Sequence, residues 1–281
     1  EGNLKRSWDS GVTEGHGMTL VKEGDTEYLW IADNGRKKRW SSDYEYPGGM
    51  DAQYSGKVVK QELDGNTVLR LPMPPLRIYD SGNYAPTWVA VNEERKGGNG
   101  DVWVADGYGE DQVHRFTSSG EYLSSINGTD GKAGAFSCPH AVFVDNRKPE
   151  PELYVADRSN GRVQIYDLEG KFKRVFGSTF LTSPSGFATS GETMIIAELK
   201  ARLTLVDLDD ELIGYLGDNG PISEVDGWPN RKNDKGDPVR PKGLETGKFN
   251  SPHGMAVDKD GNIYVEEWLI GGRSIKLESV T

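Results

Sequence analysis

Residues 137–177 read SCPHAVFVDNRKPEPELYVADRSNGRVQIYDLEGKFKRVFG. After an opening proline the stretch has an apolar run, a polar turn, and a second apolar run that ends in Ala-Asp. Two further short runs follow, in which apolar and polar residues alternate. Short runs of this kind between Gly- and Asp-containing turns are typical of strands joined by hairpins. The stretch therefore predicts one antiparallel sheet of four strands.

The same order of features returns along the rest of the chain. The matching stretches are 84–123, 182–217, 250–277, and 14–35, which continues after an insertion at 56–71. A repeat of about 40 to 50 residues with four strands is typical of a propeller blade, because ring packing buries both faces of each sheet. We predict an all-β protein, a β-propeller with five countable four-stranded repeats.

The ends of the chain suggest how the ring closes. The N-terminal EGNLKRSWDSG resembles EGKFKRVFGS at 169–178, and the last repeat ends after its third strand at SIKLES. The sequence therefore predicts that the N-terminal strand completes the last blade. Residues 1–281 are expected to form a single propeller domain, with the polar stretches 36–56 and 217–249 as long loops over one face.

Composition supports this fold and excludes some partners. The hydrophobic content of 35% with 36 glycines and 14 prolines favours short strands and turns. A net charge of −11 argues against nucleic acid, and no apolar run is long enough to span a membrane. The single Cys138 rules out an intrachain disulfide. We expect a monomer. The start at Glu1 indicates a processed or trimmed N-terminus, compatible with secretion or a periplasmic location.

One position of the repeat is rich in histidine. It follows the opening proline of each repeat (Gly15 in the first), and we call it the slot. The slot residues, in chain order, are His16, Thr87, His140, Ser185 and His253. The first strand of a blade begins near the central channel, so slot residues converge there. Three imidazoles meeting in this way would form a three-nitrogen metal site with an open position, as in catalytic zinc sites. Alternatively, each histidine caps its strand or satisfies a buried carbonyl.

The end of the second strand also faces the mouth of the channel. The residues there are Asp33-Asn34, Asp106-Gly107-Tyr108, Asp157-Arg158, Glu198 and Glu266-Glu267. The recurring aspartates are predicted to be structural, with carboxylates that bind nearby backbone N–H groups. Tyr108 and Arg158 depart from the pattern on adjacent blades. A tyrosine near a metal can act as a base, and an arginine can clamp a carboxylate. Their structural alternatives are rim packing and a surface ion pair.

These motifs carry a family resemblance. ADGYGEDQVHRF, PHAVFVD with YVADRSNGRVQIY, and SPHGMAVDKDGNIYV resemble the peptidyl-α-hydroxyglycine α-amidating lyases among the NHL-repeat propellers. The resemblance implies a zinc ion bound by His16, His140 and His253, with Tyr108 and Arg158 as catalytic residues. It also implies cleavage of the C–N bond of a small carbinolamide that carries a carboxylate.

The sequence departs from that family in three respects. The lyases have six blades, and the blade ahead of the one matching His16 supplies a second functional arginine that nothing before His16 replaces here. They also have an aspartate, linked to a calcium site, where this chain has Gly254, which argues against calcium. Finally, in a ring of five the blades of His253 and His16 would be neighbours, so the three histidines are expected to be unevenly spaced.

Two other functions fit parts of the sequence. One is a non-catalytic NHL propeller whose loops bind a peptide or protein partner. The other is a lactonase-like metal-dependent hydrolase, which fits less well because calcium prefers oxygen ligands to imidazoles.

Overall fold

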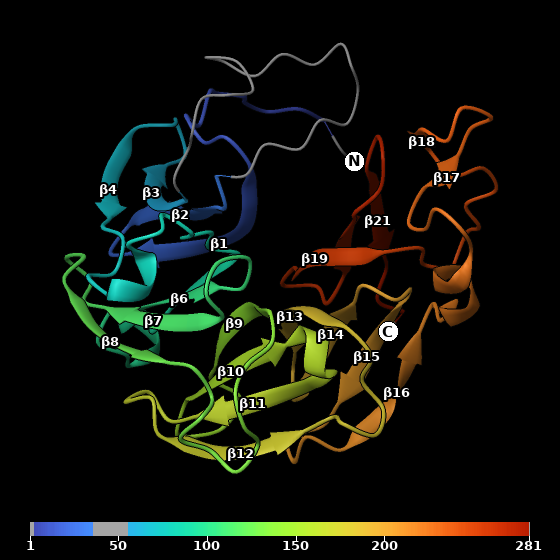
Figure 1. Ribbon diagram of the computed structural model, residues 1–281. Helices are drawn as coiled ribbons and strands as arrows, with labels where there is room; N and C mark the ends of the chain where they lie inside the picture. The colour runs from blue at the N-terminus through green and yellow to red at the C-terminus, as the bar shows by residue number, and fades with distance from the viewer. Residues whose placement is uncertain (1–2, 36–55, 281) are drawn as a thin grey trace.

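The computed structural model describes residues 3–35 and 56–280, and this part of the chain consists of β-strands with a few short 3₁₀ helices. Five antiparallel sheets surround a central axis as the blades of a five-bladed β-propeller (Figure 1). The prediction of an all-β propeller with five repeats is confirmed. We number the blades I to V in chain order.

Four blades have four strands, paired in chain order from the axis outwards. Blade I contains β1 (Gly15–Glu23), β2 (Thr26–Asp33), β3 (Lys57–Glu62) and β4 (Thr67–Leu71). Blade II contains β5 (Trp88–Val91), β6 (Val102–Asp106), β7 (Gln112–Phe116) and β8 (Tyr122–Ile126). Blade III contains β9 (Pro139–Asp145), β10 (Glu152–Asp157), β11 (Arg162–Tyr166) and β12 (Phe172–Phe176). Blade IV contains β13 (Pro184–Ser190), β14 (Thr193–Glu198), β15 (Arg202–Val206) and β16 (Leu212–Leu216). Blade V contains β19 (Pro252–Val257), β20 (Ile263–Glu267) and β21 (Arg273–Leu277).

The apolar core lies between the blades. One cluster joins blades II, III and IV around Trp103, Val155 and Ile196. A second joins blades I and II around Trp30, and a third joins blades IV and V around Val265. Second strands such as β10 are buried along their whole length because both faces of the sheet pack against a neighbour. This is why their sequences read as continuous apolar runs.

The ring has a seam between blades V and I. None of the core clusters in the described part of the chain joins these two blades. On β1, Met18 is 57% and Leu20 is 54% exposed, whereas Val21 is buried towards blade II. Figure 1 shows blades I and V set apart, while the other neighbouring blades abut.

The N-terminal segment does not close this seam, so the prediction that it completes blade V is wrong. Residues 3–12 form no strand, and blade V has three strands. Arg6 Nη1 instead donates to the carbonyl of Leu63, and Gln61 Nε2 donates to the carbonyl of Ser10. Because side chains and turns of blade I satisfy its polar groups, the segment stays on the blade that follows it.

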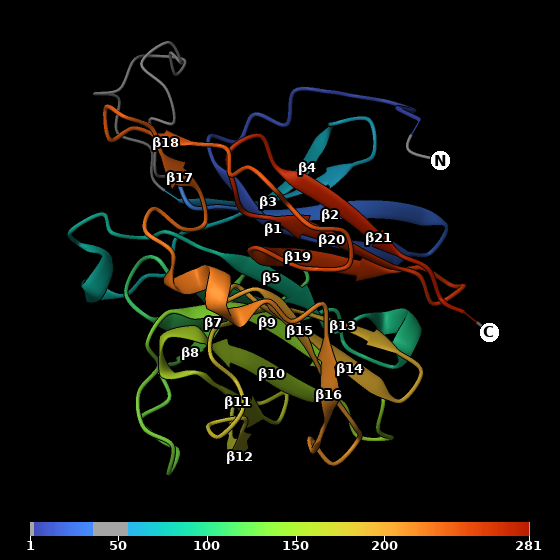
Figure 2. The ribbon, with the colours of Figure 1, turned by 90° about the vertical axis from the view of Figure 1, so that its right-hand side faces the viewer.

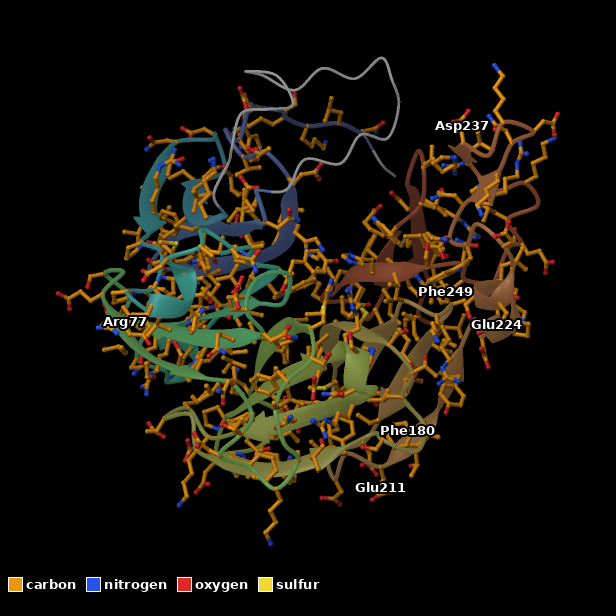
Figure 3. The ribbon with its side chains drawn as sticks, in the orientation of Figure 1. Arg77, Phe180, Glu211, Glu224, Asp237 and Phe249 are labelled. Atoms are coloured by element: carbon orange, nitrogen blue, oxygen red, sulfur yellow. The ribbon has the colours of Figure 1, made fainter. Side chains whose placement is uncertain are left out.

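The polar stretch 217–249 is largely irregular, as predicted, with a 3₁₀ helix at Gly220–Glu224 and the short ladder of β17 (Arg231–Lys232) and β18 (Pro238–Val239). This ladder lies on the face of the ring opposite to the two termini (Figure 2). Asp237 lies at the outer end of this ladder (Figure 3). The stretch ends at Phe249, which packs between blades IV and V. Of the predicted loop 36–56, residues 36–55 lie outside the described residues. No helix in the described residues is long and apolar enough to cross a membrane.

Candidate active site

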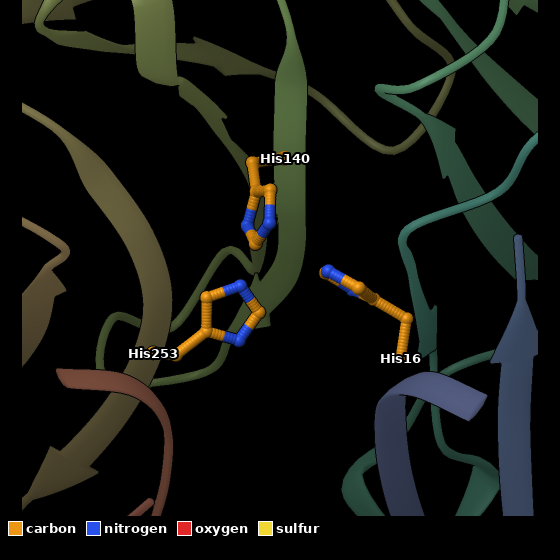
Figure 4. Close-up of side chains that lie close together, drawn as sticks. All are labelled: His16, His140 and His253. Carbon is orange, nitrogen blue, oxygen red and sulfur yellow. The ribbon is translucent and has the colours of Figure 1, made fainter. Parts of the chain in front are cut away.

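The three slot histidines meet on the axis of the ring (Figure 4). Each is the second residue of the first strand of its blade: His16 on β1, His140 on β9 and His253 on β19. The shared repeat position therefore brings together residues that lie more than 100 positions apart in the sequence. One nitrogen of each ring lies within 4.8 Å of the corresponding nitrogens of the other two.

The histidines are evenly spaced, contrary to the expectation for a ring of five. The ring centroids of His16 and His140 are 4.8 Å apart, and those of His253 lie 4.7 Å from each of the other two. Even spacing is possible because the seam leaves blades V and I further apart than other neighbours. The three histidine blades therefore take a near-threefold arrangement without six blades.

In His16 and His140, hydrogen bonds define which ring nitrogen carries the proton. Nδ1 of His16 lies 2.8 Å from the carbonyl oxygen of Thr87, and Nδ1 of His140 lies 2.8 Å from that of Ser185. A carbonyl oxygen only accepts, so each Nδ1 carries the proton and each Nε2 keeps its lone pair. Burial, followed by the charge of Arg158 and the other two histidines, holds the pKa of His140 well below 6.5. This imidazole is therefore neutral, as a metal ligand must be.

This donor set fits a zinc ion. Zinc takes imidazole nitrogens readily, and catalytic sites combine three protein ligands with one open position. On a tetrahedral zinc ion the nitrogens lie about 3.3 Å apart, given Zn–N bonds of about 2.0 Å. The candidate ligand nitrogens of the three histidines all lie within 4.8 Å of one another, so small movements of the side chains would allow all three to reach one ion.

Tyr108 and Arg158 lie directly beside the histidines. The hydroxyl of Tyr108 is 3.2 Å from Nε2 of His16 and 3.3 Å from Nε2 of His140. Nη1 of Arg158 donates to the same hydroxyl at 3.4 Å, and its guanidinium carbon lies 5.4 Å from the centre of the Tyr108 ring. The structure therefore brings all five sequence-predicted site residues into one cluster.

The residues on either side of Tyr108, Gly107 and Gly109, have no room for a side chain larger than that of glycine. A Cβ atom on Gly107 would lie 2.5 Å from the carbonyl oxygen of Pro139, and one on Gly109 would lie 2.2 Å from the Asp106 carboxylate. Asp106 accepts hydrogen bonds from the backbone N–H of Ala85, ahead of β5, and from that of Glu110, directly after this turn. The Asp-Gly-Tyr motif is thus a tight turn that directs Tyr108 towards the histidines.

The aspartates at the corners of blades I, II and III are structural, as predicted, and glutamates take the same place in blades IV and V. Each accepts a hydrogen bond from a backbone N–H of the turn that precedes the first strand of its blade. The acceptors are Asp33, Asp106, Asp157, Glu198 and Glu267. In blades I, III, IV and V a lysine or arginine of the third strand lies within 4 Å of this acid: Lys57, Arg162, Arg202 and Arg273. Blade II has Gln112 at that position.

Blade II replaces the missing cation with a buried network that the sequence analysis did not find. The hydroxyl of Tyr79 donates to Asp106 at 2.7 Å and lies 2.6 Å from Nε2 of His114. Nδ1 of His114 lies 2.6 Å from the hydroxyl of Ser125. Burial raises the pKa of Asp106 to about 6 and lowers that of His114 to about 3. A neutral His114 that donates from Nε2 to Tyr79 is consistent with these bonds. The absence of a cation opposite Asp106 was the only sequence signal for this network.

Tyr79→Phe is expected to lower the free energy of unfolding by about 1–3 kcal/mol, because it leaves a buried carboxylate and a buried imidazole each short of a partner. Urea unfolding would measure this, with Tyr215→Phe on the partly exposed edge strand β16 as the control. A Tyr79→Phe protein as stable as the Tyr215→Phe control would show that the network contributes nothing.

His114→Gln is expected to make stability less sensitive to acid. Between about pH 6.5 and 3 the unfolded state binds a proton on His114 that the folded state does not. The free energy of unfolding of the wild type therefore decreases as the pH is lowered through this range. His114 contributes at most about 1.4 kcal/mol of this decrease per pH unit. Asp106 acts in the opposite direction between about pH 4 and 6, but it is present in both proteins. Parallel stability curves for the two proteins in urea at pH 7, 6 and 5 would contradict the assignment.

Comparisons with known proteins agree with this architecture. The NHL repeat family model matches residues 249–268. The chain is 28% identical over 201 residues to peptidyl-α-hydroxyglycine α-amidating lyase 1 of Drosophila melanogaster, a match that covers 65% of this chain and 33% of that protein. It is 25% identical over 284 residues to human NHL repeat-containing protein 3, covering 98% of this chain and 70% of that protein. A match to mouse peptidyl-glycine α-amidating monooxygenase, 26% identical, covers 64% of this chain but only 17% of the mouse protein.

Solved structures show the same fold at low identity. A gluconolactonase from Xanthomonas campestris aligns with a TM-score of 0.57 and 14% identity, over 95% of this chain and 73% of that one. Virginiamycin B lyase from Staphylococcus aureus aligns with a TM-score of 0.51 and 12% identity, over 96% and 71%. The class of protein is therefore an NHL-repeat β-propeller. Among such propellers the chain resembles the α-amidating lyases.

Proposed function

We propose that this protein is a zinc-dependent lyase that cleaves the C–N bond of a small α-hydroxyglycine-type carbinolamide. The single observation that carries the proposal is the cluster of three evenly spaced histidines with a phenol and a guanidinium beside them. The lyase named among the relatives supports the choice of reaction, and the substrate is a small molecule or peptide with a carboxylate.

Each residue has a role in this reaction. His16, His140 and His253 would hold the zinc ion, which supplies Lewis-acid polarisation of the substrate hydroxyl. Tyr108, as phenolate, takes the hydroxyl proton. The C–N bond then breaks as the C=O bond of glyoxylate forms, and the proton passes from Tyr108 to the amide nitrogen. Atoms and charge balance, and the products are an amide and glyoxylate.

Arg158 has two possible tasks that its position supports. Its guanidinium is 3.4 Å from the Tyr108 hydroxyl, where a positive charge stabilises the phenolate. A guanidinium also binds a carboxylate through two parallel hydrogen bonds, which would orient the substrate. Calcium has no part in the proposal, because an all-imidazole cluster is a poor calcium site.

Two measurements on the wild type test the proposal. Metal-free protein incubated with zinc and then desalted is expected to retain one zinc ion per chain by elemental mass spectrometry. The zinc-loaded protein is expected to release glyoxylate from a peptide ending in α-hydroxyglycine. Protein that retains no zinc would refute the proposal. Protein that retains zinc but releases no glyoxylate would refute the lyase chemistry and favour a non-catalytic propeller or a hydrolase.

A further inference from the structure

The slot residues alternate around the ring. Histidine is present in blades I, III and V, and a small hydroxyl residue, Thr87 or Ser185, is present in blades II and IV. Both hydroxyl residues are completely buried between neighbouring inner strands. A side chain at such a place can set the distance between the blades on either side of it.

Thr87 touches the strands or turns of three site residues. Its carbonyl oxygen accepts the hydrogen bond from Nδ1 of His16 at 2.8 Å. Its hydroxyl lies 3.3 Å from the carbonyl oxygen of Pro139, the residue before His140, and 3.2 Å from that of Ala105 in its own blade. The backbone N–H of Gly107, the residue before Tyr108, donates to the same hydroxyl at 3.3 Å. One residue thus links His16, His140 and Tyr108.

Ser185 of blade IV makes the equivalent contacts with blades III and V. Its carbonyl oxygen accepts from Nδ1 of His140 at 2.8 Å, and its hydroxyl lies 3.4 Å from the carbonyl oxygen of Pro252, the residue before His253. The same two contacts at both non-histidine slots form a belt of hydrogen bonds that runs from His16 to His253 around the channel.

The inner strands approach closely where the belt passes. A Cβ atom on Gly17, next to His16, would lie 2.4 Å from the carbonyl oxygen of Thr87. A Cβ atom on Gly107 would lie 3.0 Å from the Thr87 hydroxyl. In this narrow space the hydroxyl of Thr87 lies between blades II and III, 3.3 Å from the carbonyl oxygen of Pro139.

We propose that Thr87 is a positioning residue for the histidine cluster, and that Ser185 performs the same task for the second pair of histidines. The proposal rests on zinc binding by the cluster, as proposed above. Thr87 does not touch the metal or substrate. It holds the backbone from which His140 and Tyr108 project and fixes the proton of His16 on Nδ1. Groups that orient a metal ligand in this way commonly affect metal affinity by about 10- to 100-fold.

The test compares zinc dissociation constants, measured by competition with a chromophoric chelator, for the wild type and three variants. Thr87→Val keeps the shape of the side chain and removes the hydroxyl, and is expected to weaken zinc binding about 10- to 100-fold. Thr87→Ser restores the hydroxyl and is expected to bind zinc within a few-fold of the wild type. Thr204→Val is the matched control, because Thr204 is equally buried and its hydroxyl donates to Glu198, away from the histidines.

Each outcome decides the proposal. Weaker zinc binding in Thr87→Val, with normal binding in Thr87→Ser and Thr204→Val, would support it. Normal binding in Thr87→Val would overturn it and leave the proposed function intact, whereas a wild type that binds no zinc would overturn both. If Thr87→Val does not fold, Ser185→Ala takes its place, with the same loss expected, and normal zinc binding in that variant would overturn the proposal.

Discussion

His140→Ala is expected to weaken zinc binding by more than about 100-fold and to abolish glyoxylate release. Loss of an orienting group alone commonly costs about 10- to 100-fold in metal affinity, and loss of a ligand removes a metal–nitrogen bond as well. His140 is the most buried of the three histidines and bonds to Ser185 through Nδ1. Zinc stoichiometry and affinity, measured on the purified variant, would provide the result.

The control for this variant lies in the same protein. His114 is the one histidine outside the slot, and His114→Gln is expected to keep full zinc stoichiometry even though it changes the response of stability to pH. His140→Gln, closer in size to histidine, separates loss of the ligand from the cavity that alanine leaves. If both His140 variants bound zinc as tightly as the wild type, the metal site would have to lie elsewhere.

Tyr108→Phe is expected to lower kcat by about 10²- to 10⁴-fold, the usual contribution of a positioned general base or acid. Zinc affinity is expected to stay within a few-fold of the wild type, because the three imidazoles remain. The phenol is the one acid–base group that reaches both His16 and His140 at hydrogen-bond distance among the described contacts. Glyoxylate release under saturating substrate would measure kcat.

Tyr215→Phe, on the partly exposed outer strand β16, is the matched control and should leave kcat unchanged. A Tyr108→Phe protein with normal kcat would exclude the phenol as base. A variant that lost zinc as well would point instead to a structural role for Tyr108 in the cluster. The combination of lost turnover and kept zinc is specific to the catalytic role.

The seam between blades V and I gives the histidine cluster its even spacing. In a closed ring of five identical blades the neighbours V and I would place His253 and His16 nearer to each other than to His140. The observed centroid distances are nearly equal, between 4.7 and 4.8 Å. The same seam leaves the side of β1 that faces blade V incompletely packed, with Met18 and Leu20 more than half exposed.

The sequence was sufficient to predict the blades and the members of the cluster. Strands and turns have local signatures, and each repeat places its slot residue at the start of the innermost strand. His16, His140 and His253 could therefore be brought together on the axis without any knowledge of pairwise contacts. Tyr108 and Arg158 could be placed beside them by the same logic, because the end of the second strand is the neighbouring position in each repeat.

Only the tertiary structure showed how these parts fit together. The N-terminal segment has the sequence pattern of an outer strand, but it forms hydrogen bonds with blade I instead of pairing with blade V. Whether it contacts blade I or blade V depends on nearby polar partners such as Gln61. The network of Tyr79 and His114 depends on a contact between segments with no common pattern. The belt through Thr87 and Ser185 joins equivalent repeat positions, but its hydrogen bonds form only where neighbouring blades pack together. A repeat determines which residues share a position, since that is a local property of the chain. The distances between the histidines, the protonation of their rings and the hydrogen bonds that hold them in place depend on how the blades pack. That packing is a property of the whole ring.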